Sequence, residues 1–142
     1  MDKQLFANSL FVSYINGTPS SERIPYVQGN ALTQEILEHL LSQVSSGCVR
    51  MVQLDDVTQE NSLVANFRNG WATVYIVKEA EDYYELLNEQ YADCENLLDI
   101  TGDGPTAQKH ATEDMDLMVK IISDFAMDGE LYPSCSWEQT VQ

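Results

Sequence analysis

The sequence predicts an α+β domain in which two helices pack together on one face of a mainly antiparallel, twisted sheet of about five or six strands. Three observations lead to this prediction. An Asn-Gly pair separates two apolar segments, apolar residues recur at helical spacing in two further segments, and short apolar runs bounded by turn residues account for much of the rest. With 142 residues, the chain is expected to form one domain around one core.

The chain opens with a predicted strand over residues 9–15, which is rich in apolar and β-branched residues and stops at a strong turn signal, Asn16-Gly17-Thr18-Pro19. Residues 23–27 are expected to pair back onto this strand. Because proline cannot donate a backbone hydrogen bond, Pro25 confines that second segment to the edge of a sheet.

A first helix is predicted from Thr33, its candidate N-cap, to about Val44. Its apolar residues are spaced for one helix face: Ile36, Leu37, Leu40, Leu41 and Val44. Ser45-Ser46-Gly47 ends the helix, and residues 48–54 resume as a strand.

A β-hairpin is predicted where residues 63–68 and 71–78 flank Asn69-Gly70, because both turn residues accept the positive φ angles of a type I′ turn. Along the second strand, side chains on both faces are largely apolar, so this strand is expected to be central. One face carries Trp71, Thr73, Tyr75 and Val77, and the other carries Ala72, Val74, Ile76 and Lys78.

A second helix is predicted over residues 113–128, with Thr112 as the N-cap and Gly129 as the left-handed stop. Residues 131–138 are interrupted by Pro133 and are not expected to be helical. The predicted core consists of Phe11, Ile36, Leu40, Val52, Val74, Ile76, Met118, Ile122 and Phe125.

The chain is strongly acidic, with 23 Asp and Glu against 7 Lys and Arg, a formal net charge of −16 and a pI near 4.1. Phosphate neutralisation needs cations, so direct nucleic-acid binding is not expected, and anionic membrane surfaces should repel the chain. The natural partner is a basic protein, although high acidity also serves solubility.

Other features favour a cytosolic protein. No apolar run approaches the roughly 20 residues that span a bilayer, and the N-terminus lacks the basic and apolar regions of a secretory signal. The three cysteines, Cys48, Cys94 and Cys135, form no Cys-x-x-Cys pair, so neither a disulfide framework nor a zinc knuckle is expected.

No catalytic, cofactor or metal site is predicted. Residues 99–104 resemble the start of a calcium loop, but its twelfth position is His110 instead of a bidentate Glu, and a tight turn explains them. The His-Glu-x-x-His, Gly-x-Ser-x-Gly and phosphate-cradling patterns are absent. The chain is therefore interpreted as non-catalytic.

Residues 79–108 carry many acids and three tyrosines without one Lys or Arg. Amphipathic tyrosines suit protein interfaces, so the segment is interpreted either as a binding surface for a basic partner or as a solvated face. The candidate partner-binding residues are Glu79, Glu81, Asp82, Tyr83, Tyr84, Glu85, Glu89, Tyr91, Asp93, Asp99 and Asp103.

The part of the chain from residue 63 to residue 138 resembles the immunity protein 1 family of bacterial polymorphic toxin systems. The resemblance rests on four features in order: Tyr75-Ile76-Val77 at the end of a central strand, Gly102-Asp103-Gly104-Pro105, Phe125 on the last helix, and Ser136-Trp137-Glu138. The family's Phe and Trp correspond to Phe125 and Trp137, for which we expect structural roles.

This resemblance implies a small α+β immunity protein that occludes the active site of a cognate toxin domain, often a nucleic-acid deaminase or nuclease. Such a toxin presents a basic groove, which accords with the acidic charge. The resemblance also implies strands and loops over residues 83–98, where Tyr83, Leu87 and Tyr91 by themselves fit a helical period. Two alternatives remain open: a DNA-mimicking inhibitor of another basic protein, and a small carboxylate-based metal-dependent enzyme.

Overall fold

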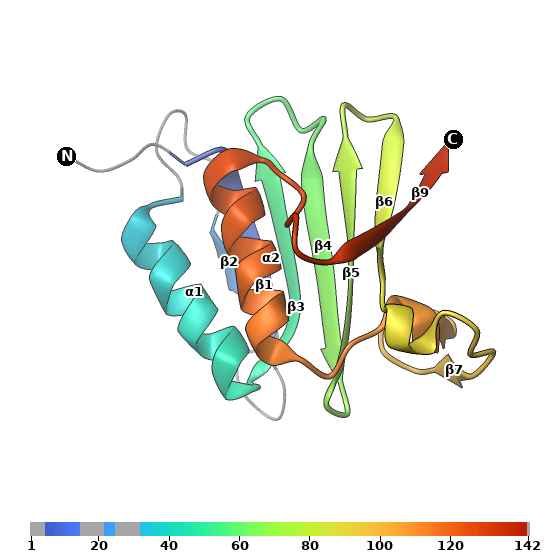
Figure 1. The fold of residues 1–142 in the computed structure, drawn as a ribbon. Coiled ribbons are helices and arrows are strands. Elements are labelled where there is room, and N and C mark those ends of the chain that lie inside the picture. Colours follow the sequence, from blue (N-terminus) through green and yellow to red (C-terminus); the bar gives the residue numbers. More distant parts are fainter. Residues whose placement is uncertain (1–4, 15–21, 25–31, 142) are drawn as a thin grey trace.

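A computed structural model describes residues 5–14, 22–24 and 32–141. In the described residues, seven antiparallel strands form one sheet in the order β2-β1-β3-β4-β5-β6-β9 (Figure 1). The strands are β1 Ala7–Tyr14, β2 Glu22–Ile24, β3 Val49–Asp56, β4 Ser62–Arg68, β5 Trp71–Lys78, β6 Asp82–Leu87 and β9 Ser136–Val141.

Helices α1 (Gln34–Ser46) and α2 (Met115–Asp128) lie side by side over one face of this sheet (Figure 1). The α+β prediction is therefore confirmed, with six strands of six to eight residues and the three-residue β2 at one edge. The remaining elements lie between β6 and α2: η1 Glu89–Tyr91, β7 Leu97–Leu98, β8 Thr106–Ala107 and η2 Gln108–His110.

Both helices begin at a side-chain cap and end at a left-handed glycine. Thr33 caps α1, accepting a hydrogen bond from the Ile36 N–H at 3.2 Å. The predicted cap of α2 is wrong, because Asp114 and not Thr112 accepts from the Leu117 N–H, at 3.1 Å. The Thr112 hydroxyl instead accepts from the Asp114 N–H, so the chain turns there before the helix starts.

The predicted hairpin is confirmed. Asn69 and Gly70 have φ angles of 57° and 83°, and β4 pairs with β5 in register from Ser62–Val77 to Arg68–Trp71. β5 lies between β4 and β6, so it is a central strand as predicted. Residues 83–98 contain most of strand β6, which pairs with β5 and β9, the short turn η1 and strand β7, so the expected strands and loops are confirmed and the helical period of Tyr83, Leu87 and Tyr91 does not form a long helix.

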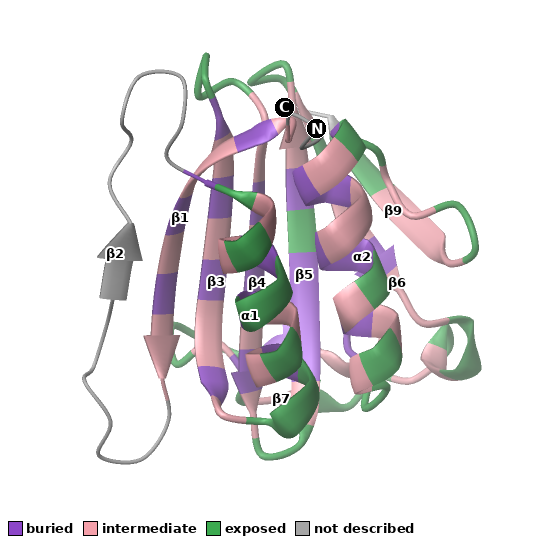
Figure 2. Cartoon of the chain, turned by 90° about the vertical axis from the view of Figure 1, so that its left-hand side faces the viewer, coloured by how far each residue is buried: buried purple, intermediate pink, exposed green. Residues whose placement is uncertain are grey.

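The core lies between the sheet and the two helices, and the strands alternate between buried and more exposed residues (Figure 2). Of the predicted core residues, Ile36 is half-buried at the edge of the core. The prediction that Phe11 belongs to the core is wrong, because Leu10 and Val12 point to the helices and Phe11 lies on the opposite face of the sheet. The rest of the predicted core is confirmed as buried: Leu40, Val52, Val74, Ile76, Met118, Ile122 and Phe125.

The C-terminal strand β9 was not predicted, although the absence of a helix there is confirmed. Trp137 in this strand packs against the core, and its indole N–H donates to the Tyr132 carbonyl at 3.0 Å, as a structural role requires. Residue 15 and residues 25–27, the ends of two predicted strands, lie outside the described residues. In the described part of the chain, helices are too short or too polar to cross a membrane.

Candidate functional site

The face of the sheet opposite the helices carries two rows of side chains that run across neighbouring strands. Strand register determines both rows, because residues paired directly across a sheet point to the same side. One row is Gln53, Val64, Tyr75, Glu85 and Glu138, and the other is Asp55, Ser62, Val77, Tyr83 and Thr140. We call this surface the open face.

An exposed aromatic pair stands on the open face. Tyr75 and Tyr83 belong to the diagonal positions of β5 and β6, and their rings lie nearly parallel, with centroids 6.2 Å apart and an interplanar angle of 13°. The two residues retain 38% and 36% of their accessible surface. Stacked aromatic side chains at solvent-exposed positions are typical anchors of protein interfaces.

Carboxylates flank the aromatic pair. Partial burial raises the pKa of the Tyr75 phenol, and the neighbouring Tyr83 and Asp55 raise it further by disfavouring a second negative charge. Glu85 lies directly opposite Tyr75 on the adjacent strand. A shallow hollow of about 210 Å³ lies here, lined by Tyr75, Tyr83, Tyr84, Glu85 and Thr140.

His110 connects the two glutamates at one end of this face. Its Nε2 lies 2.7 Å from Glu138 Oε1, and its Nδ1 lies 3.4 Å from Glu85 Oε1. Lys109 Nζ lies 3.8 Å from the same Glu138 oxygen. The hydrogen bond from His110 is the main cause that lowers the pKa of Glu138. The hydrogen bond with His110 restricts how the Glu138 side chain is oriented.

Residues 88–112 cover the adjacent part of the same face. The ring centroids of Tyr91 and Trp71 lie 5.8 Å apart, and the Thr73 hydroxyl donates to the His110 carbonyl at 2.6 Å. The backbones of Ala72 and Thr112 exchange hydrogen bonds of 2.8 and 2.9 Å. The segment is therefore fixed to β5 at several points, and it bounds the open face beside Glu85.

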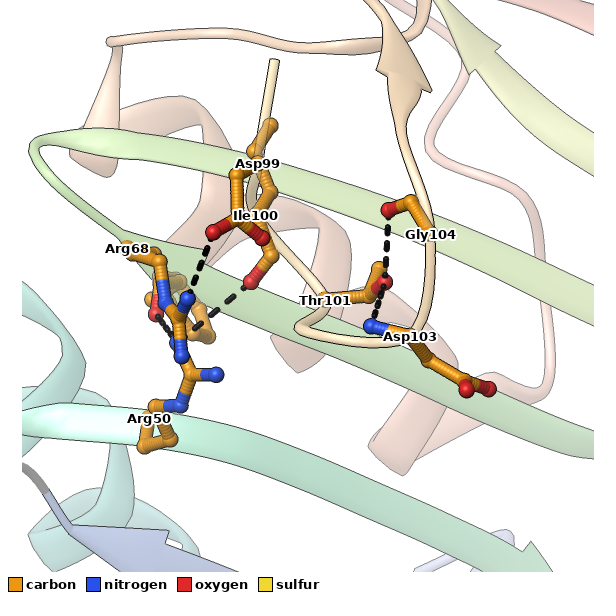
Figure 3. Close-up of polar contacts among 8 residues, drawn as sticks. Arg50, Arg68, Asp99, Ile100, Thr101, Asp103 and Gly104 are labelled. Carbon is orange, nitrogen blue, oxygen red and sulfur yellow. Dashed lines mark hydrogen bonds and ion pairs between the residues drawn. The ribbon is translucent and has the colours of Figure 1, made fainter.

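The turn that resembled a calcium loop is held by two arginines of the sheet (Figure 3). Arg68 Nη1 lies 2.8 Å from Asp99 Oδ2, and Arg50 Nη1 donates to the carbonyl of the buried Ile100 at 3.4 Å. The Thr101 hydroxyl accepts from the Asp103 N–H at 3.1 Å. Among the described residues, no group of three or more His, Cys, Asp and Glu side chains is placed to hold a metal ion.

The structure distributes the predicted partner-binding residues over several places. Tyr83 and Glu85 lie on the open face, whereas Tyr84 alternates to the helix side of the sheet and is half-buried. Tyr91 packs on Trp71. The others are exposed or half-exposed. Glu79 and Glu81 lie in the β5–β6 turn, Asp82 begins β6, Glu89 begins η1, and Asp93, Asp99 and Asp103 lie in the loops that follow.

Sequence reasoning missed four contributors to this face: Tyr75, Asp55, Glu138 and His110. The sequence pattern predicts only that Tyr75 lies on one face of a strand. Asp55, His110 and Glu138 all lie outside residues 79–103, which contain the candidate residues. One pattern in the sequence does indicate the open face. Large and partly polar side chains alternate along one strand, which is typical of a sheet face that is only partly covered: Trp71, Thr73, Tyr75 and Val77.

A second hollow, of about 350 Å³, lies between the end of β6, η1 and the start of β9. It contains Cys135, whose pKa is raised to about 11 by burial. At neutral pH this group is a thiol and not the thiolate that acts as a nucleophile. All three cysteines of the chain are free, as predicted.

The chain was compared with protein-family models, with curated proteins and with solved structures. None of them matches.

Proposed function

We propose that this chain is an immunity protein that binds and neutralises a cognate toxin domain, one that acts on nucleic acid as a deaminase or nuclease. It would occlude the toxin's active site with its open face and act in the cytosol, where nucleic acid is the toxin's target. The proposal joins the family resemblance to the charge and geometry of the open face.

The observation that carries the proposal is the Tyr75–Tyr83 pair, exposed on a rigid sheet between carboxylates. Interface energy concentrates in a few aromatic or arginine anchors, while surrounding charges set orientation and speed of encounter. Asp55, Glu85 and Glu138 lie in the same two rows as the tyrosines. An aromatic anchor bordered by acids suits a basic protein surface.

Three of the chain's cations make contacts within the chain itself. Arg68 pairs with Asp99, Arg50 donates to two backbone carbonyls, and Lys78 donates to the Gly129 carbonyl. A formal net charge of −16 remains after all seven Lys and Arg are counted. A toxin groove that binds phosphates through Lys and Arg is attracted to this negative charge. While the open face occupies that groove, the toxin cannot bind nucleic acid there.

The test is co-expression with the product of the adjacent upstream gene, followed by purification on a tag fused to this chain. We expect one basic partner in a stoichiometric complex, whose activity on DNA or RNA is lost when the immunity protein is added and returns when the complex is dissociated. A co-purified partner that remains active in the complex would refute occlusion. Capture of many unrelated basic proteins with equal affinity would instead indicate a DNA-mimicking inhibitor.

A further inference from the structure

The hollow beside the aromatic pair combines two kinds of group in a small volume. Tyr75 and Tyr83 present ring surfaces, and Glu85 supplies a carboxylate between β5 and β9. Thr140 closes the side next to Tyr83, to which it is directly paired across the strands. Because all of these residues belong to paired strands, the register of the sheet sets the relative positions of their backbones before any ligand binds.

This combination selects for a cation. The face of a tyrosine ring is the negative end of its quadrupole and attracts positive charge, as a carboxylate does. An anionic ligand would face Glu85 and would also lie near Asp55 and Glu138 in the same rows. The hollow therefore disfavours phosphate and other anions.

The shape favours a planar cation. A guanidinium stacks flat against an aromatic ring and offers N–H groups at its edge to a carboxylate, whereas an ammonium acts as a compact point charge. The nearly parallel rings of Tyr75 and Tyr83 provide such flat surfaces. Glu85 supplies its carboxylate from β6, with Oε1 3.4 Å from His110 Nδ1.

We propose that the hollow lined by Tyr75, Tyr83, Glu85 and Thr140 is the binding site for an arginine side chain of the partner, with the guanidinium stacked on a tyrosine ring and paired with Glu85. This inference rests on the proposed function for the identity of the partner. The chemistry of the hollow itself is tested without any partner.

The first experiment titrates the ¹⁵N,¹³C-labelled protein with an N-acetyl, C-amide arginine derivative at constant ionic strength, observed by NMR. Signals of Tyr75, Tyr83, Glu85 and Thr140 are expected to shift and saturate. The corresponding citrulline derivative, which is planar but uncharged, should shift them little at the same concentrations. The lysine derivative should bind several-fold more weakly than arginine. Equal responses to arginine and citrulline, or no saturable response in the hollow, would overturn the proposal.

Two variants with a matched control extend the test. Glu85→Gln and Tyr83→Ala should each weaken arginine binding by about two- to fivefold or more, as expected for an exposed cation–π contact or ion pair. Glu38→Gln removes one exposed charge from α1, on the opposite side of the sheet, and should leave arginine binding unchanged. A spectrum that keeps its dispersion establishes that each variant is folded.

The co-purified partner separates the two proposals. If the arginine derivative binds but Glu85→Gln and Tyr83→Ala leave partner affinity unchanged, the proposed arginine contact is wrong while the immunity function stands. If the hollow binds the derivative and no neutralised toxin partner is found, the immunity function is refuted and the arginine site loses its assignment to a toxin.

Discussion

The ring of Phe6 lies where a side chain at Gly129 would be. A Cβ placed on Gly129 would come within 2.8 Å of Phe6 Cζ, and Gly129 also has a φ angle of +71° at the end of α2. Phe6 packs edge-on against Phe125, with ring centroids 5.7 Å apart, and Lys78 lies 5.8 Å above its ring. Because Gly129 has no side chain, Phe6 can pack against Phe125 at the end of α2.

Replacement of Gly129 by Ala should destabilise the protein through both the backbone and the contact with Phe6. Gly47 provides a matched control, because it ends α1 in the same left-handed conformation and a Cβ added to it would meet no atom within 4 Å. We expect Gly47→Ala to cost about 1 kcal/mol and Gly129→Ala about 2–4 kcal/mol in urea unfolding. Equal losses would mean that Phe6 moves away freely.

Truncation of Phe125 should be the more costly of two Phe→Ala changes. Phe125 is fully buried, and its replacement by Ala should reduce the free energy of unfolding by about 3–5 kcal/mol. Phe11 is half-buried on the open face, so Phe11→Ala should cost about 1–2 kcal/mol. Chemical denaturation of both variants measures the difference, and a similar cost for both would contradict the assigned faces of β1.

The carboxylate of Glu138 should make stability depend on acidic pH. The hydrogen bond from His110 lowers its pKa in the folded state below the ordinary value of 4.5. A lowered pKa contributes stability that is present above the unfolded-state value and is lost as pH falls through the folded-state value. The unfolding free energy of wild type should therefore exceed that of Glu138→Gln at pH 7, and the two should converge as pH falls through the folded-state pKa of Glu138.

Glu113→Gln controls for the loss of one exposed negative charge in that comparison. A gap between wild type and Glu138→Gln that stays constant from neutral to acidic pH would show that the carboxylate is not stabilised by His110. The contribution is small because nearly half of the Glu138 side chain, 45%, is exposed to solvent.

Charges at the β5–β6 turn should speed association with the partner. Joint neutralisation of Glu79, Glu81 and Asp82 should lower the association rate constant and flatten its dependence on salt, because exposed charges act over about 8 Å at physiological ionic strength. Three acids on the helix side serve as the control: Glu35, Glu38 and Asp116. Stopped-flow association measures this rate constant. Equal slowing by both triple variants would show that the effect depends on net charge alone and not on the position of the charges.

Local patterns in the sequence were sufficient to predict most of the fold. Asn69-Gly70 specifies its own turn, and the apolar stripes of α1 and α2 specify which helix faces are buried. Phe11 was misplaced because a strand with apolar side chains on both faces does not reveal which face meets the helices. Strand β9 was missed because its residues are polar at the sheet edge and obtain their structure from pairing with β6.

The candidate site was harder to predict because it is assembled across strands. The segment 79–103 contains Tyr83 and Glu85, but Tyr75 joins them only through the register of β5 with β6. Glu138 and His110 depend on the placement of β9 and of the segment that covers the open face. These residues become neighbours only in the folded sheet, so no motif with a fixed sequence spacing predicts the site.

The dissociation rate of the complex with the co-purified toxin tests the central claim most directly. The double variant Tyr75→Ala, Tyr83→Ala removes the aromatic pair, while Val57→Ala removes a side chain that is 60% exposed between β3 and β4. Both variants should remain folded. We predict that loss of the tyrosines speeds dissociation about tenfold or more, as loss of interface anchors does, and that the control changes it little. Unchanged dissociation without the tyrosines would contradict the assignment of the open face as the binding surface.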